Sequence, residues 1–173
     1  MRLPDYLRPG LDLVIVGINP GTRSGASGHH YAGPGNHFWP LLYESGLVDE
    51  PLTYRDDARI LEWNIGLTNM VARTTPSITD LSLDELRAGA KALARKLRQH
   101  RPRVLCFNGK RIYEVYAARP CDFGVQAEMI DGAIVYVMPS TSARTAAYQR
   151  ADKLVHFHAL KRIVDGVRAK AAS

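Results

Sequence analysis

Residues 11–39 read LDLVIVGINPGTRSGASGHHYAGPGNHFW, and this stretch decides the fold. It begins with a β-branched apolar run at 11–16, bounded by glycine and proline, which is typical of a buried strand. A long loop rich in glycine, serine and histidine follows, and an apolar helical pattern begins at 36–39. Loops of this length are usually functional or disordered, and adjacent histidines beside a tyrosine argue against disorder. In open α/β sheets, a glycine-rich turn at the carboxyl end of a strand is the usual ligand site.

The rest of the chain alternates between extended and helical patterns. Extended, largely buried patterns occur at 63–71, 103–107 and 133–138, and helical patterns at about 38–46, 82–99, 111–117 and 151–170. The helix after Ser82 has a capping-box pattern with Glu85. Its expected apolar face consists of Leu83, Leu86, Ala90, Leu93 and Leu97. This alternation predicts an α/β fold with a mostly parallel central sheet. The length of 173 residues predicts one domain, residues 1–173.

Composition narrows the class of protein. Apolar residues make up 46% of the chain, and no apolar run approaches the roughly 18 residues that span a bilayer. The segment MRLPDYLRPG lacks the apolar core of a signal peptide, so we expect a cytoplasmic protein, associated with the nucleoid in a bacterium, and no membrane partner. Cys106 and Cys121 follow no metal-binding spacing, which predicts no metal site. The net charge of +6 suits a nucleic-acid partner, although charge alone does not identify one.

Three predicted strands end in small polar residues. These ends are Gly17-Ile18-Asn19, Asn108-Gly109-Lys110 and Pro139-Ser140-Thr141-Ser142. Because the carboxyl ends of parallel strands lie at one edge of a sheet, glycines, amides, hydroxyls and one lysine should converge there.

Several chemistries are disfavoured at this edge. No His-x3-His pair on a helix with a carboxylate is present, which disfavours a zinc hydrolase. No G-x-S-x-G turn occurs, and the glycine loop lacks the Gly-Lys-Ser/Thr of a nucleotide phosphate loop. An amide-rich pocket remains. Asparagine is too weak a base for a difficult acyl or phosphoryl transfer. It can still position water beside a very reactive electrophile, such as the oxocarbenium-like state of N-glycosidic bond cleavage.

In such a pocket, the polar and aromatic residues near the strand ends could contact the flipped nucleotide. Tyr31 could stack on a flipped base and Asn69 could read its edge. Ser140, Ser142 and Lys110 could hold phosphates. Simpler interpretations exist for each position taken alone. Asn19 could form a turn before proline, His30 and Tyr31 could fill the core of the loop, and Asn69 could be a satisfied core amide.

The motifs taken together resemble a known family. They are GINPG (17–21), GHHY (28–31), GPGNHFW (33–39), GLTNMV (66–71), RTTP (73–76), FNGK (107–110) and MPSTSAR (138–144). In this order, over roughly residues 9–166, they resemble the mismatch-specific uracil/thymine-DNA glycosylases of the uracil-DNA glycosylase superfamily. They are more similar to the thymine-DNA glycosylase branch than to the bacterial mismatch uracil glycosylase. The resemblance implies a three-layer αβα fold, no cofactor or metal, and a monomer that acts on duplex DNA with G·U or G·T mispairs and leaves an abasic site.

The resemblance also implies residue roles. Asn19, helped by Thr75, would position the attacking water. The base would be contacted by the Ile18 backbone, His30, Tyr31 and Asn69. Phosphates would be held by Lys110, Ser140 and Ser142, and the wedge that fills the place of the flipped nucleotide would be formed by Ala143 and Arg144.

One departure from the family pattern bears on the substrate. Ser24 stands where the thymine-DNA glycosylase branch commonly has alanine, and Arg23 precedes it. Uracil is therefore the better-supported substrate, ahead of thymine. Two alternatives stay open: a non-catalytic DNA-binding module of the same fold, and a nucleotide-binding α/β enzyme. The presence of Asn19 and Thr75 argues against the first, and the missing Gly-Lys-Ser/Thr argues against the second.

Overall fold

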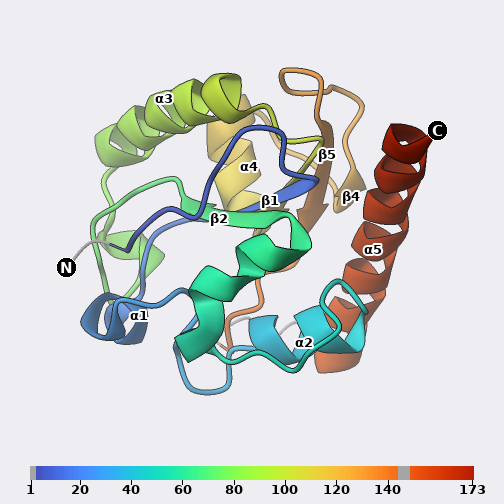
Figure 1. Ribbon diagram of the computed structural model, residues 1–173. Helices are drawn as coiled ribbons and strands as arrows, with labels where there is room; N and C mark the ends of the chain where they lie inside the picture. Colours follow the sequence, from blue (N-terminus) through green and yellow to red (C-terminus); the bar gives the residue numbers. More distant parts are fainter. Residues whose placement is uncertain (1–2, 144–148) are drawn as a thin grey trace.

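A five-stranded sheet organises the protein (Figure 1). The computed structural model describes residues 3–143 and 149–173. The strands are β1 (Leu13–Gly17), β2 (Ile65–Asn69), β3 (Val104–Asn108), β4 (Gly124–Val125) and β5 (Ile134–Met138). Their order across the sheet is β2-β1-β3-β5-β4; the pairs between β1, β2, β3 and β5 are parallel, and β4 runs antiparallel to β5. The predicted mostly parallel sheet is confirmed, and β1 lies inside it between β2 and β3.

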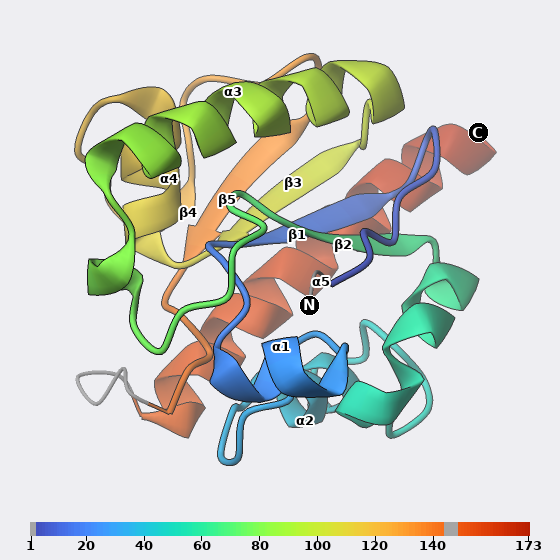
Figure 2. The same cartoon turned by 90° about the vertical axis from the view of Figure 1, so that its left-hand side faces the viewer.

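Helices cover both faces of the sheet (Figure 2). One face carries α3 (Leu83–His100) and α4 (Lys110–Ala117). The other carries α2 (Phe38–Glu44), α5 (Arg150–Ala172) and the 3-10 helix η1 (Tyr54–Trp63). Two short helices, α1 (Thr22–Ser27) and η2 (Ile78–Asp80), belong to loops that follow β1 and β2. The three-layer αβα fold is therefore present.

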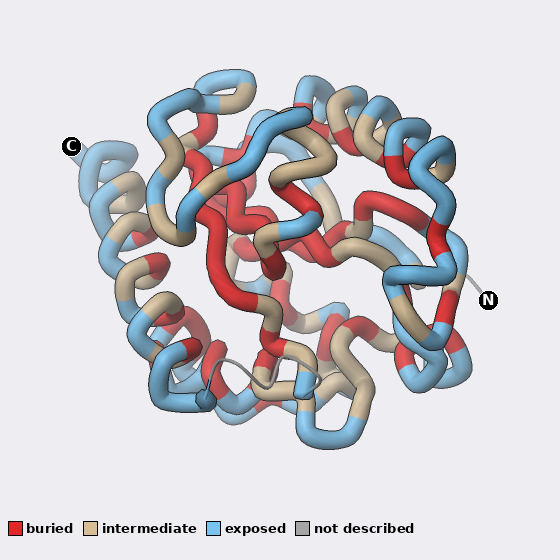
Figure 3. The backbone as a smooth tube through the Cα atoms, turned by 180° about the vertical axis from the view of Figure 1, so that it is seen from behind, coloured by how far each residue is buried: buried red, intermediate tan, exposed pale blue. Residues whose placement is uncertain are grey.

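The side chains of β1 explain why its sequence is continuously apolar. Leu13 and Ile15 enter the core beneath α2 and α5, whereas Val14 and Val16 enter the core beneath α3 and α4. Successive strand residues point to opposite faces, and helices cover both. The strands form the buried centre of the molecule in Figure 3. A strand that is buried on both faces does not alternate between apolar and polar residues. The almost continuous apolar run at 11–16 follows from this burial.

The structure corrects three details. The loop after β1 contains the helix α1, although TRSGAS has no apolar periodicity. Leu83 is 51% exposed and is wrongly assigned to the apolar face of α3, because it opens toward the groove between α3 and α4. The edge strand β4 was not predicted, because its two residues are too few to show a sequence pattern typical of a strand. The capping box of Ser82 and Glu85 is confirmed. Within the described residues, no helix combines the length and apolar character needed to cross a bilayer.

Candidate active site

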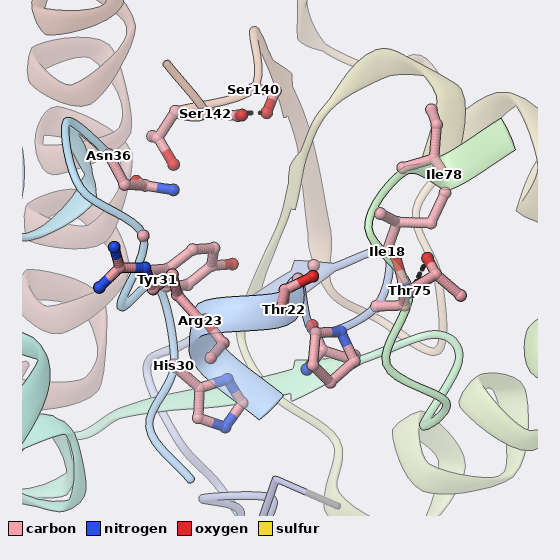
Figure 4. A pocket seen from close by; sticks show the side chains of 18 of the residues that line it. Ile18, Thr22, Arg23, His30, Tyr31, Asn36, Thr75, Ile78, Ser140 and Ser142 are labelled. Atoms are coloured by element: carbon pink, nitrogen blue, oxygen red, sulfur yellow. Dashed lines mark hydrogen bonds between the residues drawn. The ribbon is translucent and has the colours of Figure 1, made fainter. Parts of the chain in front are cut away.

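A cavity of about 690 Å³ opens at the carboxyl edge of the sheet. The ends of β1, β2 and β3 line it, together with the turn after β5, as the shared-edge argument predicted. In Figure 4, Tyr31 and Thr75 approach the cavity from opposite sides, and Ser140 and Ser142 lie on a third. Residues distant in sequence therefore meet in one concave site.

The side-chain amide of Asn19 has a defined orientation. Its Nδ2 donates to the Arg73 carbonyl and to the Thr75 hydroxyl, each at 2.8 Å. A backbone carbonyl can only accept, so the nitrogen must face Arg73. The Thr75 hydroxyl donates its hydrogen to the Ser77 carbonyl at 2.7 Å. The lone pairs of the hydroxyl oxygen therefore remain available to accept from Asn19. Asn19 Oδ1 has no hydrogen-bond partner among the described residues, and Asn19 lines the cavity, so this oxygen is available to a ligand or water.

Tyr31 has a rigid backing. Its ring stacks on Phe38 with centroids 4.0 Å apart and an interplanar angle of 19°. Phe38 is fully buried. Burial raises the pKa of the Tyr31 hydroxyl well above its ordinary value, and a hydrogen bond with Asn108 lowers it in part. Because one ring face packs on Phe38 and the residue lines the cavity, the neutral ring can offer its other face to a planar base.

His30 is part of an anchored loop. It is only 2% exposed, its Nε2 lies 2.7 Å from the Pro4 carbonyl, and its backbone N–H donates to Asp57 Oδ2 at 2.9 Å. Burial is the main cause of its lowered pKa, so the ring is neutral at pH 7. The other Asp57 oxygen lies 3.0 Å from His29 Nδ1 and accepts from the Tyr6 hydroxyl at 3.2 Å. His30 thus lines the cavity and also holds the loop in place.

The floor of the cavity depends on a glycine. Gly17 pairs with Asn69 across β1 and β2. A Cβ atom at Gly17 would collide with Asn69 Oδ1 and lie 3.2 Å from the Tyr31 hydroxyl. The Asn69 amide makes no hydrogen bond to another described residue, so it can pair with a base. The carbonyl of Ile18 already accepts from the Val71 N–H at 2.8 Å, which leaves the Ile18 N–H as its main-chain contact for a base.

The turn after β5 is fixed by hydrogen bonds to side chains and main chain of neighbouring elements. Asn108 Nδ2 donates to the Thr141 hydroxyl, and the Thr141 N–H donates to Asn108 Oδ1, each at 3.0 Å. The His37 N–H donates to the Thr141 carbonyl at 3.0 Å. Lys153 of α5 is 1% exposed, and its Nζ lies 3.2 Å from both the Ser142 carbonyl and His37 Nδ1. These contacts fix Ser140 and Ser142 at the rim.

The remaining predicted contacts divide into three cases. Ser140, Ser142 and Ala143 line the cavity as expected. Lys110 does not: it begins α4, and its Nζ lies 4.7 Å from the centroid of the Phe123 ring. The Lys110 side chain is therefore directed away from the cavity, and its contact with a phosphate stays a prediction. Arg144, the predicted wedge, lies outside the described residues.

Sequence reasoning missed the contributions of three residues that shape the site: Asp57, Asn108 and Lys153. The sequence singles out Arg23 only for its place before Ser24, and the structure adds that it lines the cavity. Asn108 stands in a recognised strand-end motif, which places it at this edge of the sheet but does not indicate its contact with Thr141. Asp57 and Lys153 occur in ordinary polar and amphipathic segments and gave no local signal. Among residues 3–143 and 149–173, no group of three or more His, Cys, Asp or Glu side chains could hold a metal ion.

Two comparisons with known proteins bear on the family and the fold of this chain. The family model of the uracil DNA glycosylase superfamily matches residues 4–162. Among solved structures, a similar one is the solution NMR structure of a candidate uracil DNA glycosylase from Methanosarcina acetivorans, with a TM-score of 0.57 and 19% identity. The match covers 92% of this chain and 97% of that one, and at this identity it shows a shared fold. The family match spans nearly the whole chain, and the protein therefore belongs to the uracil DNA glycosylase superfamily.

Proposed function

We propose that the protein hydrolyses the N-glycosidic bond of uracil mispaired with guanine in duplex DNA and leaves an abasic site. The observation that carries this proposal is the fixed amide of Asn19. Its nitrogen is committed to Arg73 and Thr75, and its oxygen is free at the cavity. Modified pyrimidines and thymine paired with guanine are further candidate substrates.

The reaction needs little base strength. Asn19 Oδ1 accepts a hydrogen bond from a water and aims its oxygen at C1′ of the flipped nucleotide. The C1′–N1 bond breaks with its electron pair on the base, the water oxygen bonds to C1′, and the water proton passes to solvent. The base leaves as an anion and takes up a proton. Because C1′ is then strongly electron-deficient, positioning of water is more important than its deprotonation.

The cavity offers complementary contacts for a pyrimidine. The free face of Tyr31 stacks on the ring, and the amide of Asn69 supplies one acceptor and two donors for the base edge. The side chains lining the cavity include no carboxylate among the described residues, which favours a leaving group that becomes an anion. A mismatched base is also easier to extrude than a paired one, and this supports the choice of G·U duplex as substrate.

A substrate panel tests the proposal. Purified protein is incubated with duplexes that contain G·U, A·U or G·T, and with single-stranded uracil DNA, and abasic sites are then cleaved by alkali. We expect strand cleavage on G·U above all other substrates. Binding of G·U duplex without base release would instead identify the non-catalytic module. Tight binding of free mononucleotides without release of a base would identify a nucleotide-binding enzyme.

A further inference from the structure

The mouth of the cavity carries a cation to which sequence motifs assigned no binding role. Arg23 of α1 lines the cavity and is exposed. Among the described cavity-lining residues, it alone has a formal charge at neutral pH, since His30 is neutral. No hydrogen bond or ion pair to another described residue holds its guanidinium. In the view of Figure 4, the side chain runs past the Tyr31 ring toward the side of the cavity from which Asn36 points inward.

Arg23 differs from several other arginines of the protein, whose charge is neutralised by a carboxylate. Arg59 is bound by Glu50 and Glu62, Arg73 by Glu85, and Arg168 by Asp12. No carboxylate lines the cavity among the described residues, so nothing there neutralises Arg23. An exposed guanidinium beside neutral amides and hydroxyls is well placed for an anion, and its fork of donors matches phosphate oxygens.

We propose that Arg23 binds a backbone phosphate of the damaged strand next to the flipped nucleotide. The inference rests on the proposed function, because it places a nucleotide in the cavity. A flipped nucleotide enters base first, so its phosphates stay at the mouth, where Arg23 is exposed. Arg23 then supplies the cationic contact expected of Lys110, whose ammonium group lies over Phe123. Neutral hydroxyls at Ser140 and Ser142 complete the phosphate contacts on the side of the turn.

The test measures binding and does not depend on catalysis. Duplexes carry a G·U pair whose deoxyuridine has a 2′-fluorine, which slows cleavage by disfavouring the oxocarbenium-like state. Fluorescence anisotropy gives Kd over a series of salt concentrations. We expect Arg23→Met to weaken binding about tenfold and to lower the slope of log Kd against log salt by about 0.9, the loss of one phosphate contact.

Arg98→Met is the matched control. Arg98 is also exposed and has no ion pair among the described residues, but it lies near the end of α3 that leads into the start of β3, at the amino edge of the sheet. Its replacement removes the same charge from the opposite side of the molecule. We expect a change in Kd of less than about twofold, because long-range charge effects are screened by salt.

A scan of neutral phosphates identifies the contact. Methylphosphonate replaces one phosphate at a time on either side of the uridine, and each duplex is titrated with wild type and Arg23→Met. The proposal predicts one position in the strand where a methylphosphonate weakens binding by the wild-type protein but does not weaken binding by Arg23→Met any further. This is the result expected when the phosphate and Arg23 contact each other. Equal effects on both proteins at every position would overturn it. A slower single-turnover rate with unchanged Kd would also overturn it, since Arg23 would then act on the reacting base. A protein that binds in the predicted way but releases no uracil would refute only the proposed activity.

Discussion

The side-chain nitrogen of Asn19 lies 2.8 Å from the Thr75 hydroxyl oxygen, although 56 residues separate them in the chain. The contact joins the turn after β1 to the loop after β2. The Thr75 N–H strengthens this junction by donating to the Pro20 carbonyl at 3.2 Å. Thr75 therefore acts on the proposed water through the orientation of the Asn19 amide.

Replacing Thr75 by valine tests this positioning role. Valine keeps the shape of threonine but cannot accept from Asn19 Nδ2 or donate to the Ser77 carbonyl. Loss of one such hydrogen bond is worth about 1 to 1.5 kcal/mol, so we expect the single-turnover rate to fall about tenfold. Thr75→Ser retains the hydroxyl and should restore most of the rate. Equal rates for the valine and serine variants would argue that the hydroxyl has no positioning role.

A methyl group at Gly17 should damage the floor of the cavity without unfolding the protein. The alanine Cβ would collide with Asn69 Oδ1, which is the end of a flexible side chain and can move away. We expect Gly17→Ala to lower the rate at least tenfold because Asn69 loses its place beneath the base, while Tm changes by only a few degrees. Gly166→Ala in α5, where the added Cβ meets nothing within 4 Å, is the control and should leave the rate unchanged. A normal rate for Gly17→Ala would count against a base-reading role of Asn69.

Lys153 should affect DNA binding through the turn after β5. Its buried Nζ contacts the Ser142 carbonyl and His37. Methionine fills a similar volume without the ammonium group, and burial lowers the pKa of Lys153, so the protein should keep its stability. We expect Lys153→Met to raise the Kd for G·U duplex about fivefold, since Ser140 and Ser142 lose their fixed position. Lys161→Met, eight residues further along the same helix at a half-buried lysine that pairs with Asp165, should leave Kd unchanged; equal effects of the two variants would refute the positioning role.

Stability should fall when the protein is acidified below pH 6.5. Burial lowers the pKa of His30 from its ordinary value of 6.5, so between 6.5 and the lowered value the unfolded chain binds a proton that the folded protein does not. The unfolded state is then favoured as pH falls, and the effect is absent above that window. Thermal unfolding from pH 8 to 5 measures it. His30→Gln should flatten the decline; an equally steep decline in the variant would show that other groups cause it, including His37 and His156, whose pKa values are also lowered.

Features with a local sequence signal were predictable. The interior position of β1 makes an uninterrupted apolar run, and Ser82 with Glu85 marks the start of α3. The convergence of strand ends followed from parallel topology alone. These signals sufficed for the fold, the position of the cavity and several residues that line it.

Features set by tertiary contacts were not predictable. Asn108 and Thr141 are joined across 33 residues, and neither position shows this pairing in its local sequence. Lys110 follows β3 as predicted, but its side chain turns to Phe123, a choice that depends on packing. The helix α1 forms without apolar periodicity, and its buried Gly25 packs closely on Thr74, a residue distant in the sequence. Such contacts are properties of the assembled structure.

The most direct test of the central claim is the single-turnover rate of Asn19→Ala on G·U duplex, measured together with the Kd for the 2′-fluoro duplex. The free amide oxygen is the group that would hold the attacking water, so we expect the rate to fall at least about 100-fold. Kd should stay within about threefold of wild type, because phosphate contacts dominate binding. An unchanged rate in a folded variant with normal Kd would contradict the proposed mechanism.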